Sequence, residues 1–217
     1  MTLRLKRIGL IGDIHAEHEY LETALQYLKP RVDRILAVGD IVDGRGDTDR
    51  CVELLKQYDV ACVRGNHDRW LLASTHRIHE LFALSGPTQD YLATLPATQL
   101  HDTVAGPLLL CHGLGEDDMV FIDTALREAK DERKERGRLQ RLVPGDVKLV
   151  VAGHTHQRGV QRLGRGISVI NAGTLKDGDN PCFGILNLDD EFVQYFDLED
   201  GGVVRGAEII NIRGERK

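Results

Sequence analysis

The chain has 217 residues and a net charge of -6 at pH 7, with a sequence pI near 5.8. This acidic balance argues against a general affinity for nucleic acid or for an anionic membrane, because both need a basic protein surface. No apolar run approaches the roughly 20 residues that span a bilayer, and the first residues lead directly into an expected strand, so we expect a cytoplasmic protein. A chain of this size can bury a full core as one unit, and we predict a single domain over residues 1–217.

The first part of the chain alternates short apolar runs with amphipathic segments. Runs of strand length and composition are found at residues 8–11, 35–38 and 60–63. Helical patterns follow them at residues 17–28, 48–57, 70–84 and 88–95. This repetition of strand, polar loop and helix predicts parallel strands joined by right-handed crossovers.

The rest of the chain is dominated by strand patterns. These runs lie at residues 100–104, 108–111, 149–152, 160–163, 167–170, 183–188, 192–196 and 203–210. A charged insertion at about residues 118–142 is interpreted as a solvated helix, with a cationic lid over an anionic substrate as the alternative. The four cysteines form no CxxC pair and are interpreted as reduced core residues. We therefore predict an α/β fold with two packed mixed β-sheets flanked by helices.

Five polar clusters directly follow five of these apolar runs. They are Asp13-Ile14-His15, Gly39-Asp40-Ile41-Val42-Asp43, Gly65-Asn66-His67-Asp68, His112-Gly113 and Gly153-His154-Thr155-His156. In open α/β sheets, the crevice beyond the carboxyl ends of the strands is where ligands bind, so residues distant in sequence can meet there. Imidazole nitrogens with carboxylate and amide oxygens suit Mn, Fe, Co, Ni or Zn. The clusters therefore predict one site for two divalent metal ions, with Mn the expected metal.

Asp40 is the expected bridge between these ions. Two ions about 3.5 to 4 Å apart can clamp an in-line displacement at phosphorus when a carboxylate links them. Taken singly, Asp13 and Asp40 are also typical of turn or helix caps, and His112 and His154 of hydrogen-bonded core histidines. Because five of the nine histidines fall in the ordered clusters, the conjunction favours the metal site.

The ordered pattern DxH, GDxxD, GNHD, a lone H and GHxH resembles the calcineurin-like metallophosphoesterase superfamily. The resemblance covers nearly the whole chain, through Asn171-Ala172-Gly173-Thr174. It implies a four-layer α/β/β/α sandwich and a metal-dependent phosphoesterase. Such an enzyme would hydrolyse a phosphomonoester or phosphodiester, on a small or nucleotide-like substrate, by attack of a metal-bridging hydroxide.

The resemblance also implies a role for each residue of the clusters. The implied ligands are Asp13, His15 and His156 for the first metal, Asn66, His112 and His154 for the second, and Asp40 for both. His67 matches the catalytic histidine of the family, placed to protonate or stabilise the leaving oxygen. Asp43 matches the acidic residue that orients this histidine, and Asp68 is an alternative partner.

Two departures from the family pattern bear on the substrate. Ala16 follows His15 where many phosphoprotein and dinucleoside polyphosphate phosphatases have glycine, and Gly44 follows Asp43 where they have arginine. Arg45 and Arg64 are then the candidates for a phosphate contact. The departures weaken both a protein phosphatase and a diadenosine polyphosphate assignment.

Two other classes of function fit parts of the pattern. A non-catalytic metal-binding scaffold predicts loss of the catalytic histidine, whereas His67 is present. A nuclease could use the same metals, but only the cationic residues between 127 and 141 favour it. The preferred hypothesis is an enzyme for a small phosphorylated substrate, without a membrane or nucleic-acid partner and with homo-oligomer formation left open.

Overall fold

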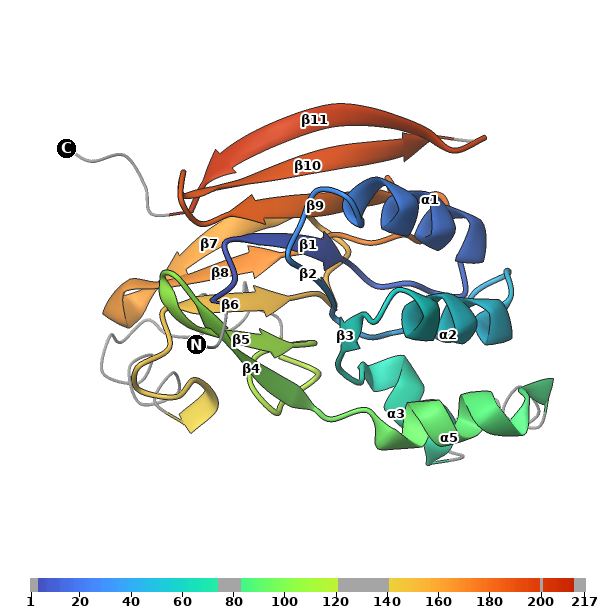
Figure 1. Ribbon diagram of the computed structural model, residues 1–217. Coiled ribbons are helices and arrows are strands. Elements are labelled where there is room, and N and C mark those ends of the chain that lie inside the picture. The colour runs from blue at the N-terminus through green and yellow to red at the C-terminus, as the bar shows by residue number, and fades with distance from the viewer. Residues whose placement is uncertain (1–3, 74–82, 121–140, 200, 213–217) are drawn as a thin grey trace.

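The computed structural model describes residues 4–73, 83–120, 141–199 and 201–212, in which two mixed β-sheets pack face to face (Figure 1). The larger sheet has the order β11 (Val203–Asn211), β10 (Phe192–Glu199), β9 (Cys182–Asn187), β1 (Arg7–Ile11), β2 (Arg34–Ala37) and β3 (Ala61–Cys62). The smaller sheet has the order β4 (Thr98–Thr103), β5 (Gly106–Cys111), β6 (Leu149–Ala152), β8 (Ile167–Asn171) and β7 (Gly159–Leu163). These two sheets confirm the predicted α/β class.

Each sheet combines three parallel strands with antiparallel ones. In the larger sheet β1, β2 and β3 are parallel, and β9 pairs antiparallel with β1. In the smaller sheet β5, β6 and β8 are parallel, whereas β4 and β7 are antiparallel to their neighbours. The arrowheads of β1, β5 and β6 point to the same side of the molecule, so the loops that follow these strands gather there (Figure 1).

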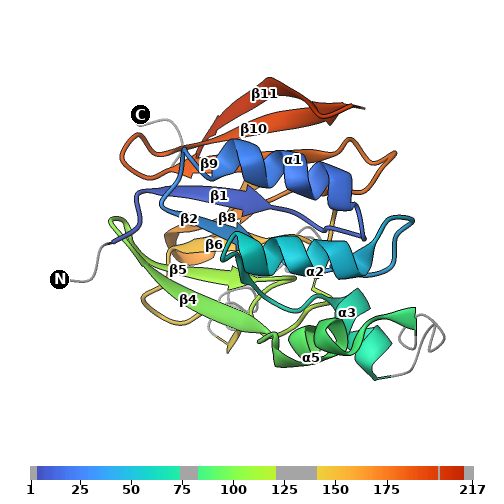
Figure 2. The ribbon, with the colours of Figure 1, turned by 45° about the vertical axis from the view of Figure 1, so that its right-hand side comes forward.

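The helices lie together on the outer face of the larger sheet (Figure 2). They are α1 (His18–Leu28), α2 (Thr48–Gln57), α3 (Asn66–Leu72) and α5 (Gly86–Thr94). The buried positions of α1, Leu21, Ala24, Leu25 and Leu28, recur at helical spacing and form its apolar face. No helix in the described residues is long and apolar enough to cross a membrane.

Alternation along the strands divides the apolar interior into layers. Ile8 and Leu10 of β1 join the cluster between the two sheets, whereas Ile11 joins the cluster under the helices. A third cluster, which includes Val150 and Val169, covers the outer face of the smaller sheet. From Ile8 to Ile11 both faces of β1 are buried, and this part of the strand is without polar side chains, as the apolar run in the sequence indicated.

Two predicted segments differ from the structure or lie outside it. The helix expected at residues 70–84 begins at Asn66, and residues 74–82 lie outside the described part of the chain. The third polar cluster is therefore the first turn of a helix and not only a loop. Most of the charged insertion predicted at residues 118–142 also lies outside the described residues, because these stop at 120 and resume at 141.

Candidate metal centre

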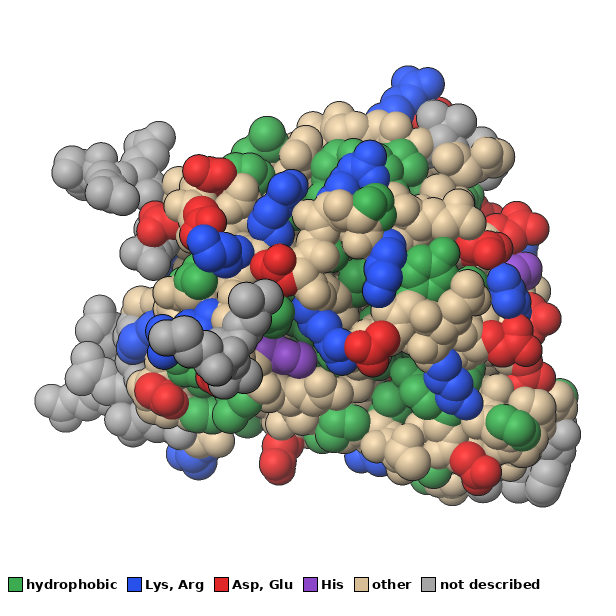
Figure 3. Space-filling view, viewed as in Figure 1, with side chains coloured by type: hydrophobic (Ala, Val, Ile, Leu, Met, Phe, Trp, Pro, Cys, Tyr) green, Lys and Arg blue, Asp and Glu red, His purple; other side chains and the backbone are tan. Residues whose placement is uncertain are grey.

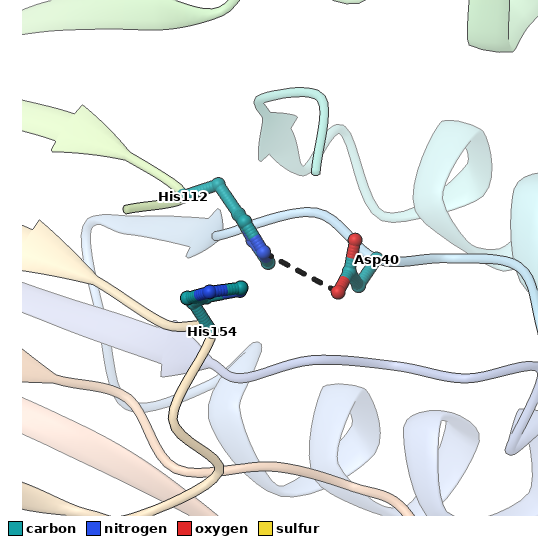
Figure 4. A group of neighbouring side chains, drawn as sticks. All are labelled: Asp40, His112 and His154. Carbon is teal, nitrogen blue, oxygen red and sulfur yellow. Dashed lines mark ion pairs between the residues drawn. The ribbon is translucent and has the colours of Figure 1, made fainter. Parts of the chain in front are cut away.

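The segments that follow β1, β2, β3, β5 and β6 bring predicted ligands together at the ends of these strands. Figure 4 shows Asp40 from the loop after β2, His112 from the end of β5 and His154 from the loop after β6 pointing toward one another. One potential ligand atom from each of these three residues lies within 4.8 Å of the others. Asp40 and His112 are buried, and His154 is partly buried.

The side of the centre around His112 has closely spaced ligand atoms. Its Nε2 lies 2.8 Å from Oδ1 of Asn66 and 3.3 Å from Oδ2 of Asp40. The other carboxylate oxygen of Asp40 accepts a hydrogen bond of 2.9 Å from the backbone N–H of His67. Asn66 and His67 open α3, so the start of this helix and the loop after β2 are fixed to each other.

The other side of the centre contains Asp13, His15 and His156. The Nε2 atoms of His15 and His156 lie 3.0 Å apart, and Oδ2 of Asp13 lies 3.9 Å from Nε2 of His156. Asp13 is fully buried, and its Oδ2 has no hydrogen-bond partner among the described residues. Burying a carboxylate oxygen without a hydrogen-bond donor costs free energy unless a bound cation compensates its charge.

Hydrogen bonds to the other ring nitrogen aim three of the histidines into the centre. Nδ1 of His15 lies 3.2 Å from the carbonyl of Asp43, and Nδ1 of His112 lies 2.9 Å from the carbonyl of Val38. Nδ1 of His156 lies 2.8 Å from Oδ2 of Asp179. Each of these acceptors requires a proton on Nδ1, which leaves the lone pair on Nε2 free to bind a metal.

These spacings and atom types fit divalent metal ions. Bonds from a metal to nitrogen or oxygen ligands are about 2.0 to 2.2 Å long, so two adjacent ligands at a right angle are about 3 Å apart. The separations between His15 and His156, and between His112 and both Asn66 and Asp40, are 2.8 to 3.3 Å. The mixture of imidazole, carboxylate and amide ligands suits transition metals better than Mg or Ca.

Burial and the charges within the cluster set its electrostatics. Burial lowers the pKa values of His15 and His154 to about 4, so both are neutral and available as ligands at neutral pH. Burial alone would raise the pKa of Asp40, but His112, His67 and His15 together outweigh it and lower this pKa to about 2. Conversely, burial opposes the charge of His112, but Asp40 and Asp13 raise its pKa to about 9.

His67 and Asp43 form a pair at the edge of the centre. Nδ1 of His67 lies 2.6 Å from Oδ2 of Asp43, and Nε2 of His67 lies 4.0 Å from Oδ2 of Asp40. Its side chain is 28% exposed, so His67 faces both the centre and the solvent. The carboxylate of Asp43 can hold the proton of Nδ1 and leave Nε2 to exchange a proton with a substrate.

Asp68, the alternative partner of His67, has a different place. It is fully buried, and its Oδ1 accepts hydrogen bonds from the backbone N–H groups of Ile41 and Val42 at 2.9 and 3.3 Å. Its Oδ2 accepts a bond of 2.9 Å from the N–H of Gly65. Asp68 therefore links the start of α3 to the loop after β2. Burial and, to a smaller extent, the negative charge of Asp40 raise the pKa of Asp68 to about 7.

The two candidate phosphate-binding arginines lie in separate grooves. Arg45 is exposed in a groove of about 590 Å³ beside the start of α1, together with Glu17 and Asp177. Arg64 is partly buried in a groove of about 650 Å³ that also contains Arg69. None of the candidate metal ligands is among the residues that line these two grooves.

The sequence patterns did not indicate two acidic residues of the site. Asp179, in the loop between β8 and β9, is the hydrogen-bond partner of His156. Asp118 accepts two hydrogen bonds from Arg69, at 2.6 and 2.8 Å, and its charge acts on His154. Neither residue belongs to a motif that could have indicated it.

A two-sheet α/β sandwich with this ligand cluster at the strand ends defines a metallophosphoesterase-type protein. The family model of the calcineurin-like phosphoesterase superfamily domain matches residues 7–191. The chain therefore belongs to the calcineurin-like phosphoesterase superfamily, which supports a hydrolase.

Two curated bacterial phosphatases are each similar to about a third of the chain. Serine/threonine-protein phosphatase 2 of Escherichia coli is 33% identical over 69 residues, which are 31% of this chain and 32% of that protein. Serine/threonine-protein phosphatase 1 of Salmonella typhimurium is 32% identical over 69 residues, with the same coverage of 31% and 32%. The match thus spans about a third of the length of these relatives.

Solved structures resemble the fold over almost the whole chain. A metallophosphoesterase from Sphaerobacter thermophilus has a TM-score of 0.66 and 24% identity, covering 89% of this chain and 88% of the other. A dimetal phosphatase from Danio rerio has a TM-score of 0.53 and 12% identity, covering 97% and 99%. At these identities the likeness supports the fold alone.

Proposed function

We propose that the protein is a dinuclear-metal phosphoesterase that hydrolyses a small phosphorylated substrate, either a monoester or a diester. The observation that carries the proposal is the position of the His67–Asp43 pair beside the convergent ligand set, with Nε2 of His67 4.0 Å from the carboxylate of Asp40. A proton donor at the edge of a metal centre is the arrangement that phosphoester hydrolysis needs.

Seven residues would hold the metals. Asp13, His15 and His156 would bind the first ion, Asn66, His112 and His154 the second, and Asp40 both. Two bound divalent ions supply Lewis acidity toward the phosphoryl oxygens and activate water at neutral pH. We propose Mn first, with Fe, Zn, Ni and Co as alternatives, because the ligand set combines carboxylate and amide oxygens with imidazole nitrogens.

His67 would act on the leaving group. Its Nδ1–H is held by Asp43, so Nε2 can carry the proton that the leaving oxygen needs when the phosphoester bond breaks. Positive charge on this ring is disfavoured beside two dications unless a carboxylate compensates it, and Asp43 supplies that charge. Arg64, whose groove lies beside the start of α3, is proposed to contact the phosphate before Arg45.

The test is metal-dependent turnover with generic esters. The protein is stripped of metal, and Mn, Ni, Co, Zn or Mg is added back singly with p-nitrophenyl phosphate or bis(p-nitrophenyl) phosphate. We expect turnover only with added metal and a sharp fall in the His67→Ala protein, and the preferred ester would define the substrate class. Turnover that persists without metal, or at full rate in His67→Ala, would refute the proposal.

The same preparation separates the two alternative functions. Bound ions without turnover of either ester would favour a metal-binding scaffold. A nuclease needs a basic surface, but Lys and Arg side chains are interspersed with Asp and Glu on the face shown in Figure 3. Undetectable binding of single-stranded or duplex DNA and RNA at low salt, where phosphate contacts are strongest, would exclude it.

A further inference from the structure

Two histidines of the metal centre, His112 and His156, are held by different kinds of acceptor. Nδ1 of His112 faces the backbone carbonyl of Val38, and both residues are fully buried. Nδ1 of His156 instead faces the side-chain carboxylate of Asp179, at 2.8 Å. The side chains of His156 and Asp179 are 23% and 41% exposed, so this contact is at the surface of the protein.

The carboxylate of Asp179 selects the ring form of His156 that can bind a metal. The Nε2 atoms of His156 and His15 lie 3.0 Å apart, close enough for a hydrogen bond between the two rings. If His156 carried its proton on Nε2, it would donate that proton to His15 and neither atom could bind an ion. An acceptor at Nδ1 holds the proton there and leaves Nε2 as a lone pair.

Lys176 competes for the same carboxylate oxygen. Its Nζ lies 3.4 Å from Oδ2 of Asp179, three residues along the same loop. A cation at this oxygen draws negative charge away from His156 and so weakens the effect of Asp179 on the ring. The screening is moderate, because the side chains of Lys176 and Asp179 are 45% and 41% exposed.

We propose that Asp179 is a positioning residue for the first metal position, which Asp13, His15 and His156 form. The inference builds on the metal sites of the proposed function. It follows from the 2.8 Å contact by which the solvent-exposed carboxylate of Asp179 holds the Nδ1 proton of His156, whereas Nδ1 of His15 in the same position faces the backbone carbonyl of Asp43. Of these two acceptors, only the carboxylate can be removed by substitution, so replacing Asp179 tests this position without altering a metal ligand.

The test is a Mn²⁺ titration of metal-free protein by calorimetry, with Asp179→Ala against the unaltered protein. We expect both proteins to bind two ions. In the variant, the ion at the first metal position should bind about 10- to 100-fold more weakly, and the affinity for the other ion should not change. Asp179→Asn keeps an acceptor oxygen for Nδ1–H and should recover part of this loss. With Co²⁺ in place of Mn²⁺, the visible absorption of only one bound ion should change.

The same loop offers two matched controls. Asp177→Ala removes a carboxylate that is not the hydrogen-bond partner of His156, and should bind both ions as the unaltered protein does. Lys176→Ala removes the competing cation. This variant should bind the ion at the first metal position as tightly as the unaltered protein does, or more tightly. Thermal unfolding of the metal-free variants checks that each one folds.

Three outcomes would overturn the inference. They are unchanged affinities in Asp179→Ala, an equal loss in Asp177→Ala, and a loss in Lys176→Ala as large as that in Asp179→Ala. The last two would mean that the loop as a whole, and not the Asp179 carboxylate, determines affinity. Binding is measured without substrate, so a protein that binds both ions but turns over no ester would refute the proposed function and leave this inference to be decided by the titration.

Discussion

Replacing Gly65 by alanine should damage the metal centre through a single methyl group. A Cβ at this position would lie 2.1 Å from Oδ1 and 2.4 Å from the backbone nitrogen of Asp40. Ordinary contacts begin near 3.4 Å, so the carboxylate or the start of α3 must move by roughly 1 Å. The backbone at Gly65 is extended, with φ -89° and ψ 178°, so alanine brings no backbone strain and the effect is steric.

Overpacking of this kind costs about 1 to 3 kcal/mol, which corresponds to a fall in Tm of roughly 2 to 12 °C for a chain of this size. Because Asp40 is the proposed bridge, Mn²⁺ titration of Gly65→Ala should also show weaker binding of both ions. Gly86→Ala is the matched control, since a Cβ there meets no atom within 4 Å. If Gly65→Ala bound two ions as tightly as Gly86→Ala and unfolded at the same temperature, the assigned contact between Gly65 and Asp40 would be wrong.

Three further predictions concern catalysis, protonation and backbone strain. His67→Ala should lower turnover by about 10²- to 10⁴-fold. Asp43→Asn should lower it by less, because an amide oxygen can still accept a hydrogen bond from Nδ1–H of His67. Equal rates for the Asp43 variant and the unaltered protein would contradict the pairing of Asp43 with His67. The pKa of His112 is raised to about 9, so below that pH a metal must displace a proton from this residue. Metal affinity should therefore rise with pH up to about 9. Calorimetry at pH 7.5 in buffers of different ionisation enthalpy should detect the released proton. Ala16 has φ 61°, a backbone conformation that glycine adopts more easily than alanine. Ala16→Gly should therefore raise the free energy of unfolding, measured in urea melts, by up to about 1 kcal/mol. A decrease of about 1 kcal/mol would instead show that packing of the buried Ala16 methyl group dominates.

The strands, and the convergence of candidate ligands at their ends, could be predicted from the sequence because a strand that is buried on both faces is continuously apolar. The five runs that precede the polar clusters correspond to β1, β2, β3, β5 and β6. Each run ends where its strand leaves the core, so the first polar residues beyond it fall at the edge where the sheets meet the site. The predicted residues Asp40, His112 and His154 accordingly lie together.

Contacts made by single side chains across the fold could not be predicted in the same way. Asp43 and Asp68 are both close to His67 in sequence, and only the fold directs Asp43 to the imidazole and Asp68 to backbone N–H groups. The start of α3 was missed because its first turn is polar and carries no apolar periodicity. Asp179 reaches His156 across 23 residues through a loop with no sequence signal of its own.

Backbone strain at the site explains why the ligands need the rest of the fold. Nine residues other than glycine have positive φ in the described part of the chain, and six of them belong to the site loops: His15, Ala16, Asp40, Asp43, His154 and His156. Such a conformation costs about 1 to 2 kcal/mol per residue and persists only where the surroundings impose it. The N–H groups of Ile14 and His15, in the loop after β1, both donate to the carbonyl of Asp40, in the loop after β2, at 2.9 and 2.8 Å. These bonds turn two of the clusters toward each other, so the hydrogen-bonded loops hold the ligands in place at the expense of local strain.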